Sequence, residues 1–529
     1  MNLFGLPPTG RSNPPAFLNA RSCREWLEGQ PWADPAQSQA RLLGQLNPLN
    51  RFTLQADERL RILEQMRESI YSVQSDCARK FAGRPLPLAP GEKACFDANQ
   101  ALWETLRTGY LRCLNACLEG DAKVSGQSAL IAHRALHAMS MQQLDTLRAP
   151  HMPPSGFWRT LHQILFVAER LRIIDSRVVD PLQPQNRDST VHSAYASILL
   201  LNAASPYALP YKQIQVAHRW LSKWGGKADI SSAPAQDGRI APVAIDLDQD
   251  SPSTHPNSNA SNLRWLSLEK LARSVKRRVR MLEQGESPDA LRLGREFPRE
   301  ATIGLLMHIY RHCCRGGFAR TFPRRDGHQV VQLIAGADCV IHALAGQHFV
   351  HTQPNIDSLA ASAGFDRHSL PPPGLTLEAS YQIERWEVID ESPGGMRLVR
   401  LLDQPGVRLG PSQLLALSSD GGDQFQLGSS RWALNMPSGE LHSGVQVFAG
   451  RPQVVGIRRI SATVKDPLRS GFVLPEVTKI GQPACIITPV AWYRKDRELE
   501  VIDGPAKRIR LTGLVERGTD FERATFEAA

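Results

Sequence analysis

Apolar residues recur at spacings of three and four through the first half of the chain, which is the period of amphipathic helices. One run consists of Leu60, Leu63, Met66, Ile70 and Val73, and another consists of Leu102, Leu106, Tyr110, Cys113 and Cys117. Further helical patterns cover residues 129–148, 157–174, 190–203 and 211–223. The spacing predicts an all-helical domain over residues 51–248, which ends in a short β-like run and follows an irregular N-terminal segment at residues 1–50.

The second half of the chain changes to a period of two, which is typical of half-buried strands. Trp386 and Val388 alternate with Glu387 and Ile389, and after a turn Met396 and Leu398 alternate with Arg397 and Val399. The turn sequence Ser-Pro-Gly-Gly suits a type II turn, in which Gly394 would take a positive φ. We therefore predict a hairpin over residues 386–400.

More β-like runs follow the hairpin at short intervals, separated by Gly, Pro and Asp. They cover residues 407–417, 425–434 and 441–448, and five others lie beyond residue 451. Closely spaced strands with such turns are typical of a barrel or a sandwich. The fold class is therefore predicted as α+β, with the helical domain first, a β-barrel at residues 320–450 and a β-rich C-terminal module at residues 451–529.

The segment between the helices and the strands is strongly basic. The polar, proline-containing run at residues 249–262 is expected to be a linker or loop. Residues 263–319 are expected to be helical, and residues 263–325 hold fifteen Lys and Arg against six Asp and Glu. Their net charge of +9 nearly equals the +10 of the whole chain. One predicted helix there presents a basic face, formed by Arg273, Lys276, Arg277, Arg278 and Arg280.

A positive face of this kind attracts nucleic acid, anionic lipid or an acidic protein surface. It is also what an ordinary solvated helix face looks like, and no array of aromatic residues for base stacking accompanies it. Leu268, Leu271, Val275, Val279 and Leu282 are available to pack the opposite face. A nucleic-acid partner is therefore an alternative that we do not favour.

The hairpin carries the pattern Asp390-x-Ser392-x-x-Gly395, and strands follow it closely. A carboxylate can accept hydrogen bonds from a guanine edge, a hydroxyl can donate and accept, and glycine lets a ligand approach the backbone. The pattern resembles the signature of PilZ domains, small β-barrels that bind the bacterial messenger cyclic di-GMP. The same residue types also gather in ordinary turns. A strand with Arg431 and Trp432 followed by Gly-Val-Gln-Val is similar to the later strands of that family.

The PilZ family has a second motif, Arg-x-x-x-Arg, ahead of its first strand. The best match here is formed by Arg320, Arg324 and Arg325, which precede two apolar runs, HQVVQLIAG and CVIHALAG, that could be the opening strands. The guanidinium fork can grip phosphate oxygens or guanine O6 and N7 and can stack on a purine. A basic linker is the other interpretation of this segment.

The distance between the two motifs departs from the family pattern. Arg324 precedes Asp390 by 66 positions, so the resemblance requires an insertion, which we place near residues 352–381. A second Arg-x-x-x-Arg, from Arg311 to Arg315, lies on a helical pattern and leaves the assignment of the first motif open.

The resemblance implies a noncatalytic receptor that binds cyclic di-GMP through Arg320, Arg324, Arg325, Asp390, Ser392 and Gly395. Binding would regulate how the helical domain meets an unidentified protein partner. The alternatives are an interaction module whose barrel has lost nucleotide binding, and a nucleic-acid-binding protein that uses the basic helix. No cofactor other than the bound nucleotide is expected.

Catalytic and metal-binding motifs are not indicated. His133 and His137 have the spacing of a helical metal pair, but the first is not followed by Glu and no third ligand is evident, so both are expected to be structural. No phosphate-binding loop, dinucleotide fingerprint or nucleophile elbow occurs. Without a secretory signal or a membrane-length apolar run, and with nine cysteines that lack paired C-x-x-C spacing, we expect a cytoplasmic protein with reduced thiols.

Overall fold

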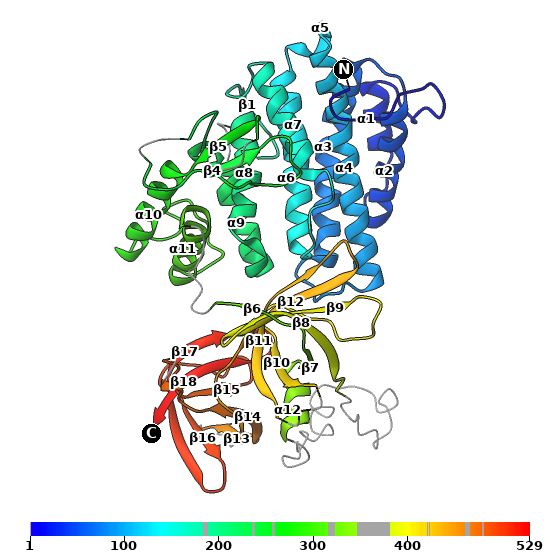
Figure 1. The fold of residues 1–529 in the computed structure, drawn as a ribbon. Helices are drawn as coiled ribbons and strands as arrows, with labels where there is room; N and C mark the ends of the chain where they lie inside the picture. Colours follow the sequence, from blue (N-terminus) through cyan, green and yellow to red (C-terminus); the bar gives the residue numbers. More distant parts are fainter. Residues whose placement is uncertain are drawn as a thin grey trace, which may run out of the picture. The chain divides into compact units, whose positions relative to one another are not determined.

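The structure of the chain is a computed structural model with two compact units (Figure 1). One unit consists of Met1–Arg84 and Leu88–Ala319, and the other of Pro85–Pro87 and Arg320–Ala529. The first is dominated by helices and the second by strands, which confirms the predicted α+β class. The structure describes residues 2–183, 189–234, 238–256, 260–315, 323–345, 381–420, 422, 424–460, 466–478 and 481–529.

The helical unit contains eleven α-helices in its described residues. In chain order they are α1 (Ala20–Glu28), α2 (Pro35–Arg51), α3 (Ala56–Phe81), α4 (Pro90–Leu118), α5 (Ala122–Ser125), α6 (Ser128–Arg148), α7 (Phe157–Arg170), α8 (Val191–Ala203), α9 (Tyr211–Trp224), α10 (Glu269–Glu283) and α11 (Arg299–Arg315). Two short 3-10 helices follow α8 and α9, at Pro206–Ala208 and Gly225–Lys227. None of the described helices combines the length and the apolar character that a membrane crossing requires.

The first fifty residues are only partly irregular, because α1 and α2 follow residues 2–19, which form no helix or strand. Asn19 caps α1 by accepting from the Ser22 amide at 2.9 Å, and Asp34 caps α2 by accepting from the Ala36 amide at 2.9 Å. Leu42, Leu46 and Leu49 of α2 are fully buried at helical spacing. The prediction of an irregular segment was therefore wrong from Ala20 onward, where side-chain caps and the apolar stripe of α2 favour helices.

The long helices α3, α4 and α6 form the centre of the unit's core. The apolar residues predicted to face the core are confirmed as buried, from Leu60 to Val73 on α3 and from Leu102 to Cys117 on α4. Helix α6 is buried on nearly all sides, from Ile131 to Leu147. In Figure 1 these helices run side by side, with α6 next to α4. A helix this enclosed has to bury its polar side chains as well.

The helical unit also contains two small sheets. The first pairs β1 (Arg177–Val178) with β2 (Ser189–Thr190), and the second has the order β3 (Asp229–Ser231), β5 (Leu263–Ser267) and β4 (Val243–Asp246). The predicted basic helical segment therefore begins with a strand, which is a correction to that boundary. Strand β5 pairs with both of its neighbours in antiparallel register.

Helix α10 carries the basic face. Leu271, Val275, Val279 and Leu282 are buried, as predicted, and Leu268 just before the helix is buried too. Arg273, Lys276, Arg277 and Arg280 are exposed, and Arg278 is half-buried against Trp224, with its guanidinium 4.8 Å from the ring centroid. The basic residues therefore cover a solvated face that is anchored by a cation–π contact.

The second unit opens with a barrel of antiparallel strands. The strands are β6 (Arg325–Asp326), β7 (Val330–Ala335), β8 (Glu384–Ser392), β9 (Gly395–Leu401), β10 (Leu414–Ser419), β11 (Gln426–Asn435) and β12 (Glu440–Val447). Their order is β6-β8-β7-β10-β11-β12-β9, and the additional pairing of β8 with β9 closes the ring. Trp386 and Val388 are buried at alternate positions, as predicted.

Two local predictions about this barrel were wrong. The run CVIHALAG forms helix α12 (Ala337–Ala345) instead of a strand. Gly336, with φ +97°, ends β7, and the Asp520 carboxylate accepts from the Ala337 amide at 2.8 Å, so the helix starts at once. The hairpin turn is not type II, because Gly394 does not have a positive φ. The predicted insertion lies outside the described residues.

The C-terminal strands form a second, closed barrel. They are β13 (Gln453–Arg459), β14 (Arg469–Leu474), β15 (Cys485–Thr488), β16 (Glu498–Ile502), β17 (Ala506–Arg517) and β18 (Glu522–Ala528), in the order β13-β14-β15-β18-β17-β16. An apolar cluster joins the two barrels: Val340 of α12 packs with Leu414 of the first barrel and Phe472 of the second. Helix α12, which was expected to be a strand, therefore packs between the two barrels.

Candidate functional site

The hairpin β8–β9 holds the predicted ligand-binding carboxylate on a bulged strand. The register runs from Val388 opposite Leu398 to Asp390 opposite Arg397, so Ile389 is an extra residue. Asp390 and Arg397 therefore share one face of the hairpin. Glu391 lies opposite Met396 on the other face. The alternation of the strand places these two neighbouring carboxylates on opposite faces, and the bulge decides that Asp390 is the one opposite Arg397.

Arg324 lies next to Asp390, although 66 residues separate the two in the sequence. Strand β6 pairs Arg325 with Glu391 and Asp326 with Asp390, which fixes the backbone before the first strand against β8. The Arg324 guanidinium donates to Asp390 Oδ1, and the two side chains keep 30% and 22% of their surface exposed. The structure thus brings together one residue from each half of the predicted site.

A second cation lies on the same face. Arg397 Nη2 donates to His442 Nδ1 at 2.9 Å, and His442 Nε2 donates to Glu440 Oε2 at 2.9 Å. Because a guanidinium can only donate, Nδ1 is the acceptor, and the imidazole links the guanidinium to the carboxylate. These hydrogen bonds, with one from Ser438, lower the pKa of Glu440. The face of β8, β9 and β12 therefore presents two arginines with two carboxylates.

The remaining predicted residues have different surroundings. Ser392 Oγ donates to the Gly395 carbonyl at 3.2 Å, so the hydroxyl closes the turn. Gly395 is buried, and a Cβ there would lie 2.3 Å from the Val445 carbonyl oxygen, so the absence of a side chain lets β9 approach β12. Arg325 is exposed on β6. Arg320 lies outside the described residues.

A pocket opens beside this hairpin on the face of Glu391. It has a volume of about 540 Å³ and is lined by Gln329, Glu391, Met396 and Arg451 among others. Gln329 Nε2 donates to Glu391 Oε2 at 2.8 Å across its wall. A site that used both sides of the bulge would therefore combine the exposed Arg324–Asp390 pair with a concave surface of small-molecule size.

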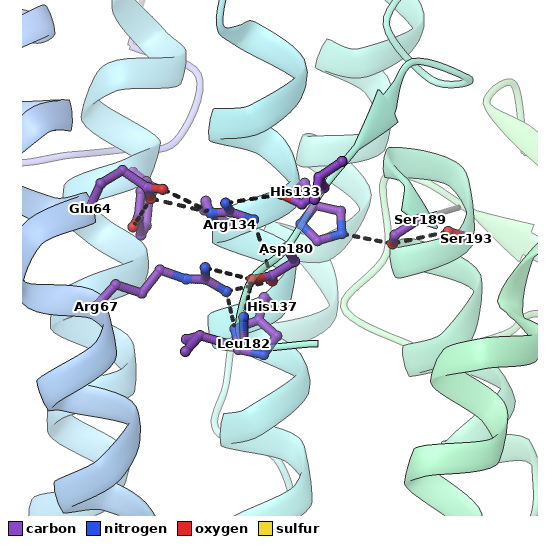
Figure 2. Close-up of polar contacts among 11 residues, drawn as sticks. Glu64, Arg67, His133, Arg134, His137, Asp180, Leu182, Ser189 and Ser193 are labelled. Carbon is purple, nitrogen blue, oxygen red and sulfur yellow. Dashed lines mark hydrogen bonds and ion pairs between the residues drawn. The ribbon is translucent and has the colours of Figure 1, made fainter. Parts of the chain in front are cut away.

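The helical unit has a polar centre that the sequence did not reveal (Figure 2). Asp180, on the segment after β1, is fully buried and accepts from Arg67 of α3 at 2.7 and 2.5 Å and from the Leu182 amide at 3.0 Å. Arg134 of α6 lies 3.3 Å from the same carboxylate and also pairs with Glu64 at 3.2 Å. Two buried guanidinium groups and two carboxylates thus balance one another.

The electrostatics of this cluster follow from its burial. Burial alone would raise the pKa of Asp180, but the hydrogen bond from Arg67 and the nearby positive charges lower it below its usual value. Burial lowers the pKa of His133 to about 4 and that of His137 well below its ordinary value, and Arg67 or Arg134 adds to each effect. Both imidazoles are therefore neutral at physiological pH.

His133 and His137 act as hydrogen-bonding groups. His133 Nε2 lies 2.7 Å from Ser189 Oγ, and His137 Nδ1 lies 3.2 Å from Arg67 Nη2. In the part of the chain that the structure describes, no three acidic, His or Cys side chains form a metal-binding group. One signal for this cluster was available in the sequence, since Arg67 interrupts the apolar stripe of α3 between Met66 and Ile70.

Comparisons with known proteins match both ends of the chain. Residues 21–236 match the family model described as "Cyclic-di-GMP receptor FimW, N-terminal domain", and residues 455–529 match "FimW C-terminal beta-barrel domain". A curated relative, the cyclic-di-GMP receptor FimW of Pseudomonas aeruginosa, is 22% identical over 575 aligned positions, which cover 99% of this chain and 93% of the relative. The chain is therefore similar to a family of cyclic-di-GMP receptors, and neither matched segment includes the barrel of β7 to β12.

Proposed function

We propose that this chain is a noncatalytic receptor for cyclic di-GMP, and that the messenger binds at the first barrel through Arg324, Arg325, Asp390, Ser392 and Gly395. The similarity to a protein described as a cyclic-di-GMP receptor supports this choice of ligand. One structural observation supports this location of the site: β6 pairs with the strand that holds the Asp-x-Ser motif, and Arg324, just before β6, contacts Asp390. Arg320 is part of the proposal by its position in the Arg motif.

On ligand binding, the ion pair between Arg324 and Asp390 would break, and each side chain would contact the ligand instead. A partly exposed ion pair stabilises a protein by up to about 1 kcal/mol. A charge-assisted contact to a phosphate or a guanine edge contributes about 1.5–3 kcal/mol. Exchanging one such pair for two ligand contacts is therefore favourable. Arg324 would grip a phosphate or a guanine, and Asp390, once released, would accept from the guanine amino and ring N–H groups.

We further propose that binding at the barrel alters how the helical unit meets a protein partner. The helical unit supplies exposed charge for such a contact on α10, through Arg273, Lys276, Arg277 and Arg280. A positive face of this kind favours an acidic protein surface over a neutral one. This makes the helical unit the output part of the receptor and the first barrel its input part.

Calorimetric titration of cyclic di-GMP into the full chain and its variants tests the binding site. We expect Arg324→Ala and Asp390→Ala each to weaken binding about 10- to 150-fold, because each removes a contact of about 1.5–3 kcal/mol. The matched control is Arg385→Ala, since Arg385 also lies on β8 and pairs with Asp420 at 2.6 Å. It should leave the affinity unchanged.

Two results would contradict this proposal. Wild-type chain that takes up no cyclic di-GMP at high-micromolar concentration would exclude the receptor function. Affinity that is unchanged in both site variants would show that the messenger binds elsewhere. Circular dichroism of each variant checks that the fold is retained.

A further inference from the structure

The helical unit contains a pocket of its own, which adjoins the buried Asp180 cluster at His137 and Leu182. It has a volume of about 480 Å³ and lies between α3, α6 and α9, the segment after β1 and the loop that follows α10. The side chains that matter for its chemistry are Tyr71, His137, His218, Trp220, Lys223 and Arg292. A pocket of this size accommodates a small molecule.

The charged side chains that line the pocket are all basic. Arg148 is paired with Asp145 at 2.8 Å, and Arg219 with Glu296 at 3.0 Å. Among the described residues, Lys223 and Arg292 have no acidic partner, and no carboxylate lines the pocket. Two uncompensated cations at a concave surface attract an anionic ligand.

Further positive charges surround Lys223 and Arg292 at the pocket. Burial lowers the pKa of Lys223, and the charges of Arg292 and Arg278 lower it further. The same holds for Lys227, whose neighbours are Arg278 and Arg277. Like charges held together in this way are stabilised when an anion binds between them, because each cation then gains a partner and loses a repulsion.

Another part of the pocket is lined by uncharged aromatic side chains. The rings of Tyr71 and His137 are stacked, with centroids 6.1 Å apart and an angle of 26°. His218 Nε2 lies 2.8 Å from Ser140 Oγ, and burial lowers the pKa of His218 to about 3, so its ring is uncharged. Flat aromatic groups of this type pack against a planar base, while amide and hydroxyl groups can bond its edge.

The wall at Leu182 is held in place by the buried cluster of Figure 2. Asp180 accepts from the Leu182 amide, and Arg67 holds Asp180 while also contacting His137. Buried hydrogen bonds therefore hold this wall of the pocket. A wall held in this way lowers the entropy cost of binding.

We propose that this pocket binds a phosphate-bearing nucleotide, with Lys223 and Arg292 on the phosphate and the aromatic wall on the base. The site is separate from the one proposed on the barrel and does not depend on it. Its ligand class follows from the combination of unpaired basic side chains, a neutral aromatic wall and a volume suited to a small molecule.

The test uses the full chain and calorimetric titration with GTP, with guanosine as the uncharged probe. We expect GTP to bind and guanosine to bind at least ~tenfold more weakly, because it lacks the charged contacts. The double variant Lys223→Glu/Arg292→Glu should lose at least ~tenfold in GTP affinity. The matched control is Lys212→Glu/Arg273→Glu, which makes the same change of net charge at exposed positions outside the pocket.

The outcomes separate this site from general attraction and from the barrel. Weaker GTP binding in both double variants alike would refute the pocket, because net charge would then explain the result. The absence of GTP binding to the wild type at millimolar concentration would also refute it. If the pocket variant alone weakens GTP and leaves cyclic di-GMP unaffected, both proposed sites stand. If it also abolishes cyclic di-GMP binding, the pocket stands and the barrel proposal fails.

Discussion

Replacement of Asp180 by Asn should destabilise the helical unit strongly. Asp180 is fully buried, and the side chains of Arg67 and Arg134 around it are only 6% and 3% exposed. Asn removes the negative charge and turns an N–H donor toward guanidinium donors, so Arg67 would lose its carboxylate partner and Arg134 would keep only Glu64. Breaking a buried ion pair by removing one partner costs about 3–5 kcal/mol. That is a large part of the 5–15 kcal/mol that typically stabilises a folded protein.

Denaturant unfolding followed by far-ultraviolet circular dichroism measures this loss, because helices dominate the signal of the unit. The matched control is Asp97→Asn, the same chemical change in an exposed pair, where Lys93 and Asp97 lie 2.6 Å apart and are 48% and 54% exposed. We expect the control to change the free energy of unfolding by less than about 1 kcal/mol. An Asp180→Asn variant as stable as this control would refute the idea that the carboxylate balances the two arginines.

Three further predictions follow from local geometry. Gly395→Ala should lower the free energy of unfolding by about 1–3 kcal/mol, because the new Cβ would clash with the Val445 carbonyl. In the control Gly394→Ala, the new Cβ would have nothing within 4 Å, so the free energy of unfolding should change by no more than about 0.5 kcal/mol. Calorimetric scans of both variants measure the difference. The helical unit should lose stability on acidification from pH 6.5 toward pH 4, because its buried neutral histidines take up protons only on unfolding. Each histidine should lower the free energy of unfolding by up to about 1.4 kcal/mol per pH unit. A free energy of unfolding that stays constant over this window would contradict the prediction. The histidines concerned are His133, His137 and His218. A fragment of residues 1–315 should unfold cooperatively and keep its helical signal, and a weak signal without a transition would count against an independent helical unit.

The helical half could be predicted because its information is local. Spacings of three and four along α3 and α4 place Leu60, Leu63 and Leu106 on buried faces, and the structure buries all of them. The basic helix α10 was predictable for the same reason. Short apolar runs carry less information, and residues 337–345 form a helix because that run packs between two barrels, a contact that no local pattern describes.

The sites depended on long-range contacts, and only some of these had a sequence signal. Two motifs of a known family implied that Arg324 and Asp390 would lie at one ligand site, although the spacing between them was unusual; the ion pair between them was not expected. The bulge at Ile389 was not expected, and it decides which carboxylate shares a face with Arg397. The contact of Arg67 with Asp180 spans 113 positions and has no motif, so only the fold reveals it.

Hydrogen–deuterium exchange of the full chain, with and without saturating cyclic di-GMP, locates the ligand and so tests whether the messenger binds at the first barrel. We expect slower exchange in peptides that cover β6 and the hairpin of β8 and β9, with Arg324→Ala removing this protection at the same ligand concentration. Protection confined to the pocket beside Lys223, or no change at the hairpin although the messenger binds, would show that the barrel is not the binding site.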